Sequence, residues 1–316
     1  MLPTPTAGLS KGETLLYEIG LKLVRMLQAL PLELVVRIGR FGGLMAWLFA
    51  RRRSRMVLEN LHMCFGAEMS PVDIRNMARE IFCRVGEGFL CVVRTSVMSR
   101  ESLEGCMSVD GLDKLCRSEG NDAPPSCVLA IGHFGNYELF AQLGKWLPGW
   151  QCMASYRSLK QKCLDRLVLQ LRSSSGCLFY ERRKETAILK AAAQRRQVIV
   201  GLLADQRVDK GVRLPFLSRA CVASRAPAVF ALRYGLRLFP AICYRVGLAQ
   251  WRLEIGDEVP TCQNGRRREV DEMTLDVNRA FEAAVRRDPV NWFWIHNRWK
   301  GHGEPLCQMP ANVHDS

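Results

Sequence analysis

The sequence lacks the patterns that mark disulfide frameworks and zinc sites. Its 13 cysteines are scattered, odd in number and never spaced C-x-x-C, and its five histidines include no H-x-x-x-H pair. This spacing predicts reduced thiols that serve as small apolar residues. We therefore expect neither a metal ion nor a cofactor.

The sequence also lacks the glycine-rich loops G-x-x-x-x-G-K-[ST] and G-x-G-x-x-G, which cradle nucleotide phosphates. No serine elbow is evident between a predicted strand and a predicted helix, and no single cysteine stands out as a nucleophile. If the chain is an enzyme, we expect its nucleophile to come from a substrate.

No apolar run reaches the roughly 20 residues that a transmembrane helix needs. Residues 15–50 are rich in Leu, Val, Ile and Met, but Glu33, Arg37 and Arg40 interrupt them. We therefore favour helices that lie in the membrane interface, with the cluster RRRSR at 51–55 on anionic head groups. The alternatives are an ordinary helix pair that covers the core and a single span, whose flanking arginines would lie on the cytoplasmic side.

The formal net charge is +14, and 35 of the 45 cationic residues are arginine. A guanidinium binds two phosphate or carboxylate oxygens at once, and a basic protein gathers near polyanions. Nucleic acid, an anionic membrane face, and a phosphorylated substrate with an acidic carrier would each fit this charge. The arginines are spread along the chain without a recognition helix or an RNP-like motif, which argues against nucleic acid.

Short apolar runs alternate with helical patterns beyond residue 120. SCVLAIGHF, RQVIVGLLADQ and LRLFPAICYRV are typical of buried strands, and YELFAQLGKWL, CLDRLVLQLRSSSG and KETAILKAAAQRR of helices. This alternation predicts an α/β fold with a mostly parallel central sheet flanked by helices. Residues 56–120 look helical, and SPVDIRNMARE begins with an N-cap serine, a proline and an acid.

The stretch IGHFGNYELF, residues 131–140, indicates a strand end, a tight loop and a helix start. His133 would lie just beyond the carboxyl end of a strand, where open α/β sheets carry their ligands. Asn136 is a natural N-cap, and Glu138 falls in the first helical turn, where we expect it to orient His133 as a general base. Taken alone, such a pair is more often a plain strand-to-helix turn.

Four segments follow one another along the chain: GHFGNYE, YRSLKQKCLDRLVLQLRSSSG, GLLADQRVDKGVRLPF and NWFWIHNRWK. In order and in register, they resemble the bacterial late acyltransferases of lipid A biosynthesis, the lauroyl and myristoyl transferase family, and the resemblance covers residues 13–300. It implies a fold like that of the glycerolipid acyltransferases. We expect disordered tails over 1–12 and 301–316, membrane-associated helices over 13–60 and an acyltransferase domain over 61–300.

The resemblance implies an enzyme on the cytoplasmic face of the bacterial inner membrane. It would move a fatty acyl chain from acyl carrier protein to a hydroxyl of a Kdo-bearing lipid A precursor, with His133 and Glu138 as base and orienting carboxylate. Each of these roles has a competing interpretation. Arg157, the arginine of YR, would be a surface cation, and Asp205 and Gln206, the DQ pair, would cap a strand end. For the tryptophans of NWFWIHNRWK we prefer a place in the core. The residues expected to bind substrate are Asn136, Arg157, Asp205, Gln206 and Arg298.

The sequence departs from the family pattern in PFLSRACVAS, where Ser218 stands in place of a glycine. We expect this block to shape the acceptor or acyl site. Three other functions stay open: acylation of another glycolipid or an aminolipid from acyl-CoA or acyl carrier protein, thioester hydrolysis by an α/β-hydrolase, and non-catalytic binding of membrane or nucleic acid by a basic protein.

Overall fold

The computed structural model describes residues 8–117, 125–181, 185, 187, 191, 197–301 and 303. Most of both predicted tails lies outside these residues, as does most of the predicted helix over 184–196. The described helices are α1 (Lys11–Ala29), α2 (Leu32–Phe49), α3 (Arg51–Phe65), α4 (Pro71–Thr95), α5 (Arg100–Glu104), α6 (Leu112–Cys116), α7 (Lys162–Ser173), α9 (Ala226–Tyr234) and α10 (Val270–Arg287), with the 3-10 helices η1 (Tyr137–Lys145) and η2 (Pro289–Asn291).

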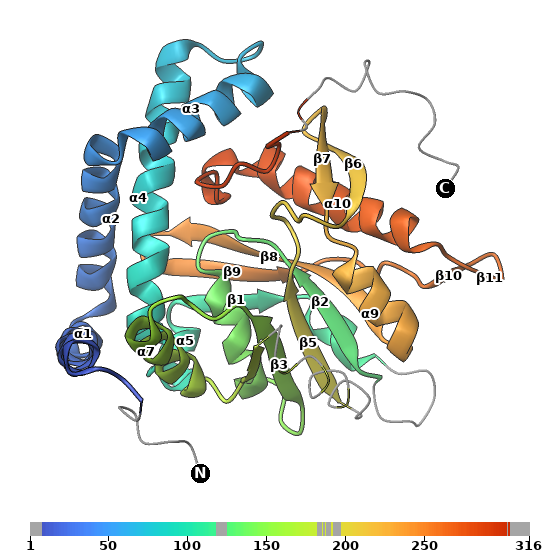
Figure 1. The fold of residues 1–316 in the computed structure, drawn as a ribbon. Helices are drawn as coiled ribbons and strands as arrows, with labels where there is room; N and C mark the ends of the chain where they lie inside the picture. The colour runs from blue at the N-terminus through green and yellow to red at the C-terminus, as the bar shows by residue number, and fades with distance from the viewer. Residues whose placement is uncertain are drawn as a thin grey trace.

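Seven strands form the central sheet in the order β1-β9-β8-β2-β5-β3-β4. Its neighbouring strands run parallel except β8 and β9, so the predicted α/β fold with a mostly parallel sheet flanked by helices is confirmed (Figure 1). The sheet strands are β1 (Met107–Asp110), β2 (Cys127–Ile131), β3 (Gln151–Tyr156), β4 (Leu178–Glu181), β5 (Val198–Leu203), β8 (Arg237–Gly247) and β9 (Gln250–Ile255). Two hairpins add β6 (Val212–Phe216) with β7 (Arg219–Ala223), and β10 (Cys262–Gln263) with β11 (Arg266–Arg267).

Strand β1 lies within residues 56–120, for which the sequence predicted only helices, and that prediction is wrong at this strand. Its four residues pair with β9, which lies far along the chain. A partner so distant leaves no trace in local periodicity. The start of α4 is confirmed, because Asp73 N donates to the Ser70 side chain at 3.2 Å and Pro71 occupies the first helical turn.

The core occupies both faces of the sheet. Along β2, Val128 and Ala130 pack in a cluster with residues of α4, α9 and α10, whereas Leu129 and Ile131 pack in a second cluster that includes η1. This alternation follows from the two-residue period of a strand that is covered on both sides. All five residues of β2 are therefore buried, and its sequence CVLAI is apolar throughout.

Helices α2 and α4 lie side by side at one edge of the molecule, with α4 next to the sheet (Figure 1). Glycines allow this close approach: a Cβ on Gly43 would lie 2.1 Å from Phe82 O, and one on Gly86 would lie 2.2 Å from Gly39 O. Within the described ranges, no helix combines the length and the hydropathy that crossing a bilayer would require. The membrane-associated part of the predicted architecture therefore stays a prediction.

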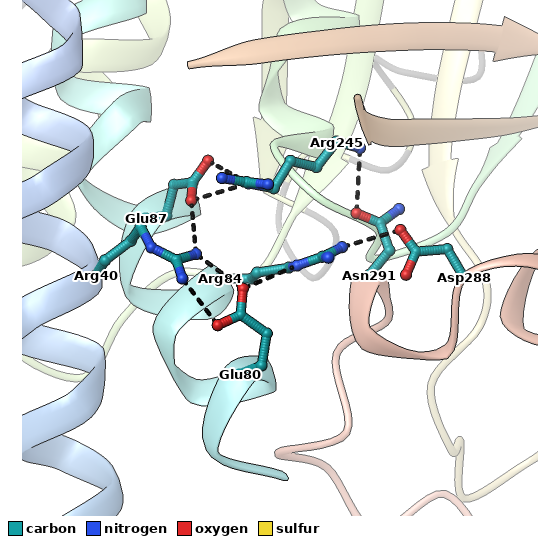
Figure 2. A network of polar contacts seen from close by, with 7 residues as sticks. All are labelled: Arg40, Glu80, Arg84, Glu87, Arg245, Asp288 and Asn291. Atoms are coloured by element: carbon teal, nitrogen blue, oxygen red, sulfur yellow. Dashed lines mark hydrogen bonds and ion pairs between the residues drawn. The ribbon is translucent and has the colours of Figure 1, made fainter. Parts of the chain in front are cut away.

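A charged network joins α2, α4, β8 and the segment around η2 (Figure 2). Glu87 on α4 is 1% exposed and accepts hydrogen bonds from Arg245 Nε at 2.8 Å and from Arg40 Nη1 at 3.3 Å. Each buried charge faces an opposite charge, as a buried ion pair requires. The members of the network are Arg40, Glu80, Arg84, Glu87, Arg245, Asp288 and the amide of Asn291.

Candidate active site

His133 and Asp205 meet because their strands are neighbours. Parallel strands β2 and β5 pair with Ile131 opposite Leu203, and each of the two polar residues follows its strand end by two positions. The carboxyl ends of parallel strands share one edge of a sheet, so the two side chains reach the same place. The Nδ1 atom of His133 lies 2.6 Å from Asp205 Oδ1.

The Asp205 carboxylate is fully enclosed and saturated with donors. Its Oδ2 accepts from the backbone N–H of His133 at 2.8 Å and from Trp292 Nε1 at 2.7 Å. Burial would raise the pKa of Asp205, but the charge and hydrogen bond of His133, together with Arg298 and Trp292, lower it to about 2. Asp205 therefore stays ionised and orients His133. The expectation that Asp205 binds substrate directly is wrong, because its side chain is 0% exposed and cannot contact a substrate.

Glu138 has a different partner from the one expected. Its Oε1 lies 2.5 Å from Arg172 Nη2 and its Oε2 lies 3.2 Å from Arg172 Nε. The predicted pairing of Glu138 with the imidazole is therefore wrong, because the His133 ring is already bound by the carboxylate at the end of β5. Burial would lower the pKa of Arg172, but the Glu138 carboxylate outweighs burial and raises it.

The loop that carries His133 is fixed on its outer side by the segment around η2. Gly135 N donates to Asn291 O at 3.0 Å, and Phe293 N donates to His133 O at 3.0 Å. The Asn291 amide in turn accepts from Arg245 N at 3.3 Å, which links this loop to the charged network of Figure 2. The imidazole has little freedom to change its orientation.

A cavity of about 840 Å³ opens beside this pair of residues. Its apolar lining includes Leu129, Ile131, Phe140, Met153 and Ile199. Its polar lining includes Arg84, His133, Asn136, Glu138, Arg157, Asp165, Arg172, Gln206, Arg207, Asp209 and His296.

The structure brings most of the predicted site residues to this cavity. Asn136, Arg157 and Gln206 all line it, with Arg157 exposed and Asn136 buried. Asn136 is the N-cap residue of η1, as predicted, but its amide makes no cap hydrogen bond, and neither its nitrogen nor its oxygen has a partner among the described residues. Glu138 does fall in the first turn of η1, as expected.

Arg298 does not reach the cavity, so its predicted contact with substrate is wrong. The guanidinium is 0% exposed, donates to the Asp205 carbonyl oxygen and to Asn278 Oδ1, and lies 4.4 Å from the centre of the Phe216 ring. Its hydrogen bond to the Asp205 carbonyl oxygen stabilises the loop that carries Asp205. The place in the core preferred for the tryptophans is confirmed, with Trp294 and Trp299 at most 4% exposed.

Comparison with known proteins bears on this geometry. The model of the family described as bacterial lipid A biosynthesis acyltransferase matches residues 9–301. The chain belongs to this family. It is therefore an acyltransferase, and the cavity beside His133 is the candidate active site of that enzyme.

Similar proteins carry acyltransferase names. A lipid A biosynthesis lauroyltransferase of Escherichia coli (strain K12) is 23% identical over 90% of this chain and 92% of its own length. A lipid A biosynthesis palmitoleoyltransferase of the same strain is 24% identical over 89% of this chain and 90% of its own length. A phosphatidylinositol mannoside acyltransferase of Mycolicibacterium smegmatis (strain ATCC 700084 / mc(2)155) is 26% identical over 56% of this chain and 58% of its own length.

Two features of the acyltransferase escaped sequence reasoning. Arg172 lies in the segment YRSLKQKCLDRLVLQLRSSSG, but nothing in the sequence distinguishes it from the other arginines. The block around Ser218 was expected to shape the acyl or acceptor site, and it instead forms the β6–β7 hairpin, none of whose strand residues lines the cavity. Leu217 and Ser218 have φ angles of 50° and 60° at the hairpin turn. Such a conformation explains why a glycine suits the second position.

Proposed function

We propose that this acyltransferase moves a fatty acyl chain from a thioester of acyl carrier protein to a hydroxyl of a Kdo-bearing lipid A precursor. The observation that carries this proposal is the His133–Asp205 hydrogen bond, with His133 in the lining of a large cavity that has many apolar wall residues. The relatives named for lipid A acylation favour the acceptor. Two features support the donor: the apolar wall suits an alkyl chain, and the net positive charge suits an acidic carrier.

His133 acts as the general base. Because Asp205 holds Nδ1, the Nε2 atom is left to take the proton from the acceptor hydroxyl. The hydroxyl oxygen attacks the thioester carbonyl carbon and the carbon–sulfur bond breaks. The thiolate leaves with the proton from the imidazolium, so charge and atoms balance.

The attacking atom comes from the acceptor rather than from the cavity wall. Burial raises the pKa of Cys152 to about 11 and also raises that of Cys177, so both thiols stay protonated and are poor nucleophiles at neutral pH. We assign the Glu138–Arg172 pair to the reacting end of the cavity. There Arg172 Nη1, which makes no hydrogen bond to the described residues, can stabilise the oxyanion.

The test is mass spectrometry of products made by the purified enzyme from a Kdo-bearing lipid A precursor, with acyl carrier protein and CoA as alternative acyl donors. We expect one added acyl chain from the carrier-protein donor, and none with His133→Ala. The half-length similarity to a phosphatidylinositol mannoside acyltransferase favours another glycolipid as the second candidate acceptor. Acylation of a mannosylated lipid but not of the lipid A precursor would reject the first acceptor while keeping the chemistry.

The N-terminal helices are proposed to hold the enzyme in the interface of the inner membrane on its cytoplasmic face. Exposed apolar residues follow helical spacing on α1 at Leu15, Ile19 and Leu23, and on α2 at Leu34, Ile38 and Phe41. The arginines at 51–53 begin α3 beside them and are exposed. Co-sedimentation should be stronger with vesicles that contain anionic lipid than with purely zwitterionic ones, and should fall when salt is raised. Equal sedimentation with both vesicle types would reject this attachment.

A further inference from the structure

Among the polar residues that line the cavity, Arg207 and His296 have no part in the proposed proton transfer. Arg207 follows Asp205 by two positions, and His296 lies on the segment beyond Trp294. The main chain at His296 is fixed, because its carbonyl oxygen accepts from Asn60 Nδ2 at 3.2 Å and from Arg298 N at 3.2 Å. The backbone that carries the imidazole is therefore held in place.

The His296 ring is uncommitted. Neither ring nitrogen has a hydrogen-bond partner among the described residues, and Nδ1 is buried, which leaves Nε2 as the nitrogen that faces the cavity. Burial is the main cause that lowers the pKa of His296 to about 4, assisted by the nearby charges of Arg298, His133 and Arg207 and opposed by Asp205. At neutral pH the ring is uncharged and can donate one hydrogen bond from Nε2.

Arg207 is also available to a ligand. Its Nη1 lies 3.1 Å from Asp209, a carboxylate that is 94% exposed, and its Nε has no hydrogen-bond partner in the part of the chain that the structure describes. Solvent screens such a pair, so an anion in the cavity can replace Asp209. Two other arginines of the wall differ in this respect: Arg172 is bound to Glu138, and Arg84 is shared between Glu80 and Asp288. Arg157 also lines the cavity, but its side chain is exposed.

We propose that Arg207 and His296 form a subsite for the phosphate oxygens of a substrate. A guanidinium offers a fork of donors and the neutral imidazole adds one more, which suits a tetrahedral oxyanion group. The subsite lies next to the His133–Asp205 pair, so it holds a phosphate close to the reacting hydroxyl. This inference rests on the proposed function, and it identifies the chemical group that the site recognises.

The phosphate has two possible sources, a sugar phosphate of the acceptor lipid or the phosphodiester of the donor's phosphopantetheine arm. The test measures kcat and the KM for each substrate in the wild type, Arg207→Gln and His296→Leu, using the acceptor with and without its phosphates. Acyl-pantetheine, which lacks phosphate, serves as the matched donor. We expect Arg207→Gln to raise the KM for the phosphate-bearing substrate about tenfold, because one charge-assisted contact is lost. The kcat should stay within about threefold of the wild-type value.

The two arms separate the sources. If the acceptor supplies the phosphate, the effect of Arg207→Gln vanishes with the dephosphorylated acceptor; if the donor supplies it, the effect vanishes with acyl-pantetheine. Asp209→Asn is the matched variant, with an expected effect in the opposite direction. It should lower the KM that Arg207→Gln raises, because it removes the carboxylate that competes for Arg207. An Arg207→Gln variant with an unchanged KM for the phosphate-bearing substrate overturns the subsite. So does a variant whose KM is raised equally for the dephosphorylated acceptor and for acyl-pantetheine. A wild-type enzyme that acylates no lipid A precursor overturns the proposed function instead.

Discussion

Asp205 Oδ1 lies 2.6 Å from His133 Nδ1, although the two residues are 72 positions apart in the chain. The contact exists because β2 and β5 are parallel neighbours that end at the same sheet edge. It assigns the orienting carboxylate to a residue that no spacing rule within the His133 loop can find. Because Asp205 binds the imidazole, Glu138 pairs with Arg172 instead.

Asp205→Asn should lower kcat by roughly 10³- to 10⁴-fold and change the KM values little. The amide keeps the shape of the carboxylate, but it neither selects the His133 tautomer nor stabilises the imidazolium. Steady-state kinetics on the purified variant measure the effect. Thermal unfolding must show a folded protein, and a kcat within threefold of the wild type would reject the assigned role.

Glu138 should couple energetically to Arg172 in a double-mutant cycle. Glu138→Gln leaves the guanidinium without its partner, and Arg172→Gln does the same to the carboxylate, so the double variant should lose less than the sum of the single losses. We expect a coupling of about 1–3 kcal/mol in the activation free energy, as for residues in contact. Arg172→Lys should restore little, because an ammonium lacks the two-pronged geometry. Additive losses would mean that the pair does not act as a unit.

Glu87→Gln should reduce the free energy of unfolding by about 3 kcal/mol, because it leaves Arg245 and Arg40 without their common buried carboxylate (Figure 2). Urea denaturation measures the change. The matched control is Glu104→Gln, which breaks an exposed pair with Arg100 and should cost less than about 1 kcal/mol. Equal effects of the two variants would show that the network of Figure 2 stabilises no more than a surface pair does.

His296 should make the folded protein less stable as the pH falls from 6.5 to 4. Burial lowers the pKa of His296 from 6.5 to about 4, so between these values the unfolded chain binds more protons than the folded one. The free energy of unfolding then falls by at most about 1.4 kcal/mol per pH unit. Denaturation curves at several pH values should show a shallower slope for His296→Gln. A slope identical to that of the wild type would contradict the burial of a neutral ring.

Ser218→Gly should raise the free energy of unfolding by roughly 0.5–1 kcal/mol. The residue has a φ of 60°, a conformation that glycine adopts without the steric cost paid by a side chain. Thermal or urea denaturation measures the gain, and activity should not change because the hairpin strands lie off the cavity. Ser158→Gly, at an exposed serine outside the positive-φ residues, should destabilise slightly or have no effect.

The sequence by itself determined the α/β alternation and the place of His133 beyond a strand end. Both are local properties: a run of four to six apolar residues is buried as a strand, and a glycine-rich turn after it puts the next polar residue at the sheet edge. The start of α4 is equally local, because Ser70, Pro71 and Asp73 are neighbours. The amphipathic character of the N-terminal helices also follows from spacing alone.

Only the tertiary structure decided which charged groups meet. The partner of His133 depends on the sheet order, which places β5 beside β2, and the choice of Arg172 from 35 arginines depends on how α7 packs near η1. The sequence suggested that Arg298 binds substrate. In the folded protein its side chain lies in the core, where it donates hydrogen bonds to the Asp205 carbonyl oxygen and to Asn278 Oδ1. Secondary structure follows from periodicities of two and 3.6 residues, whereas an ion pair follows from distances that the whole fold sets.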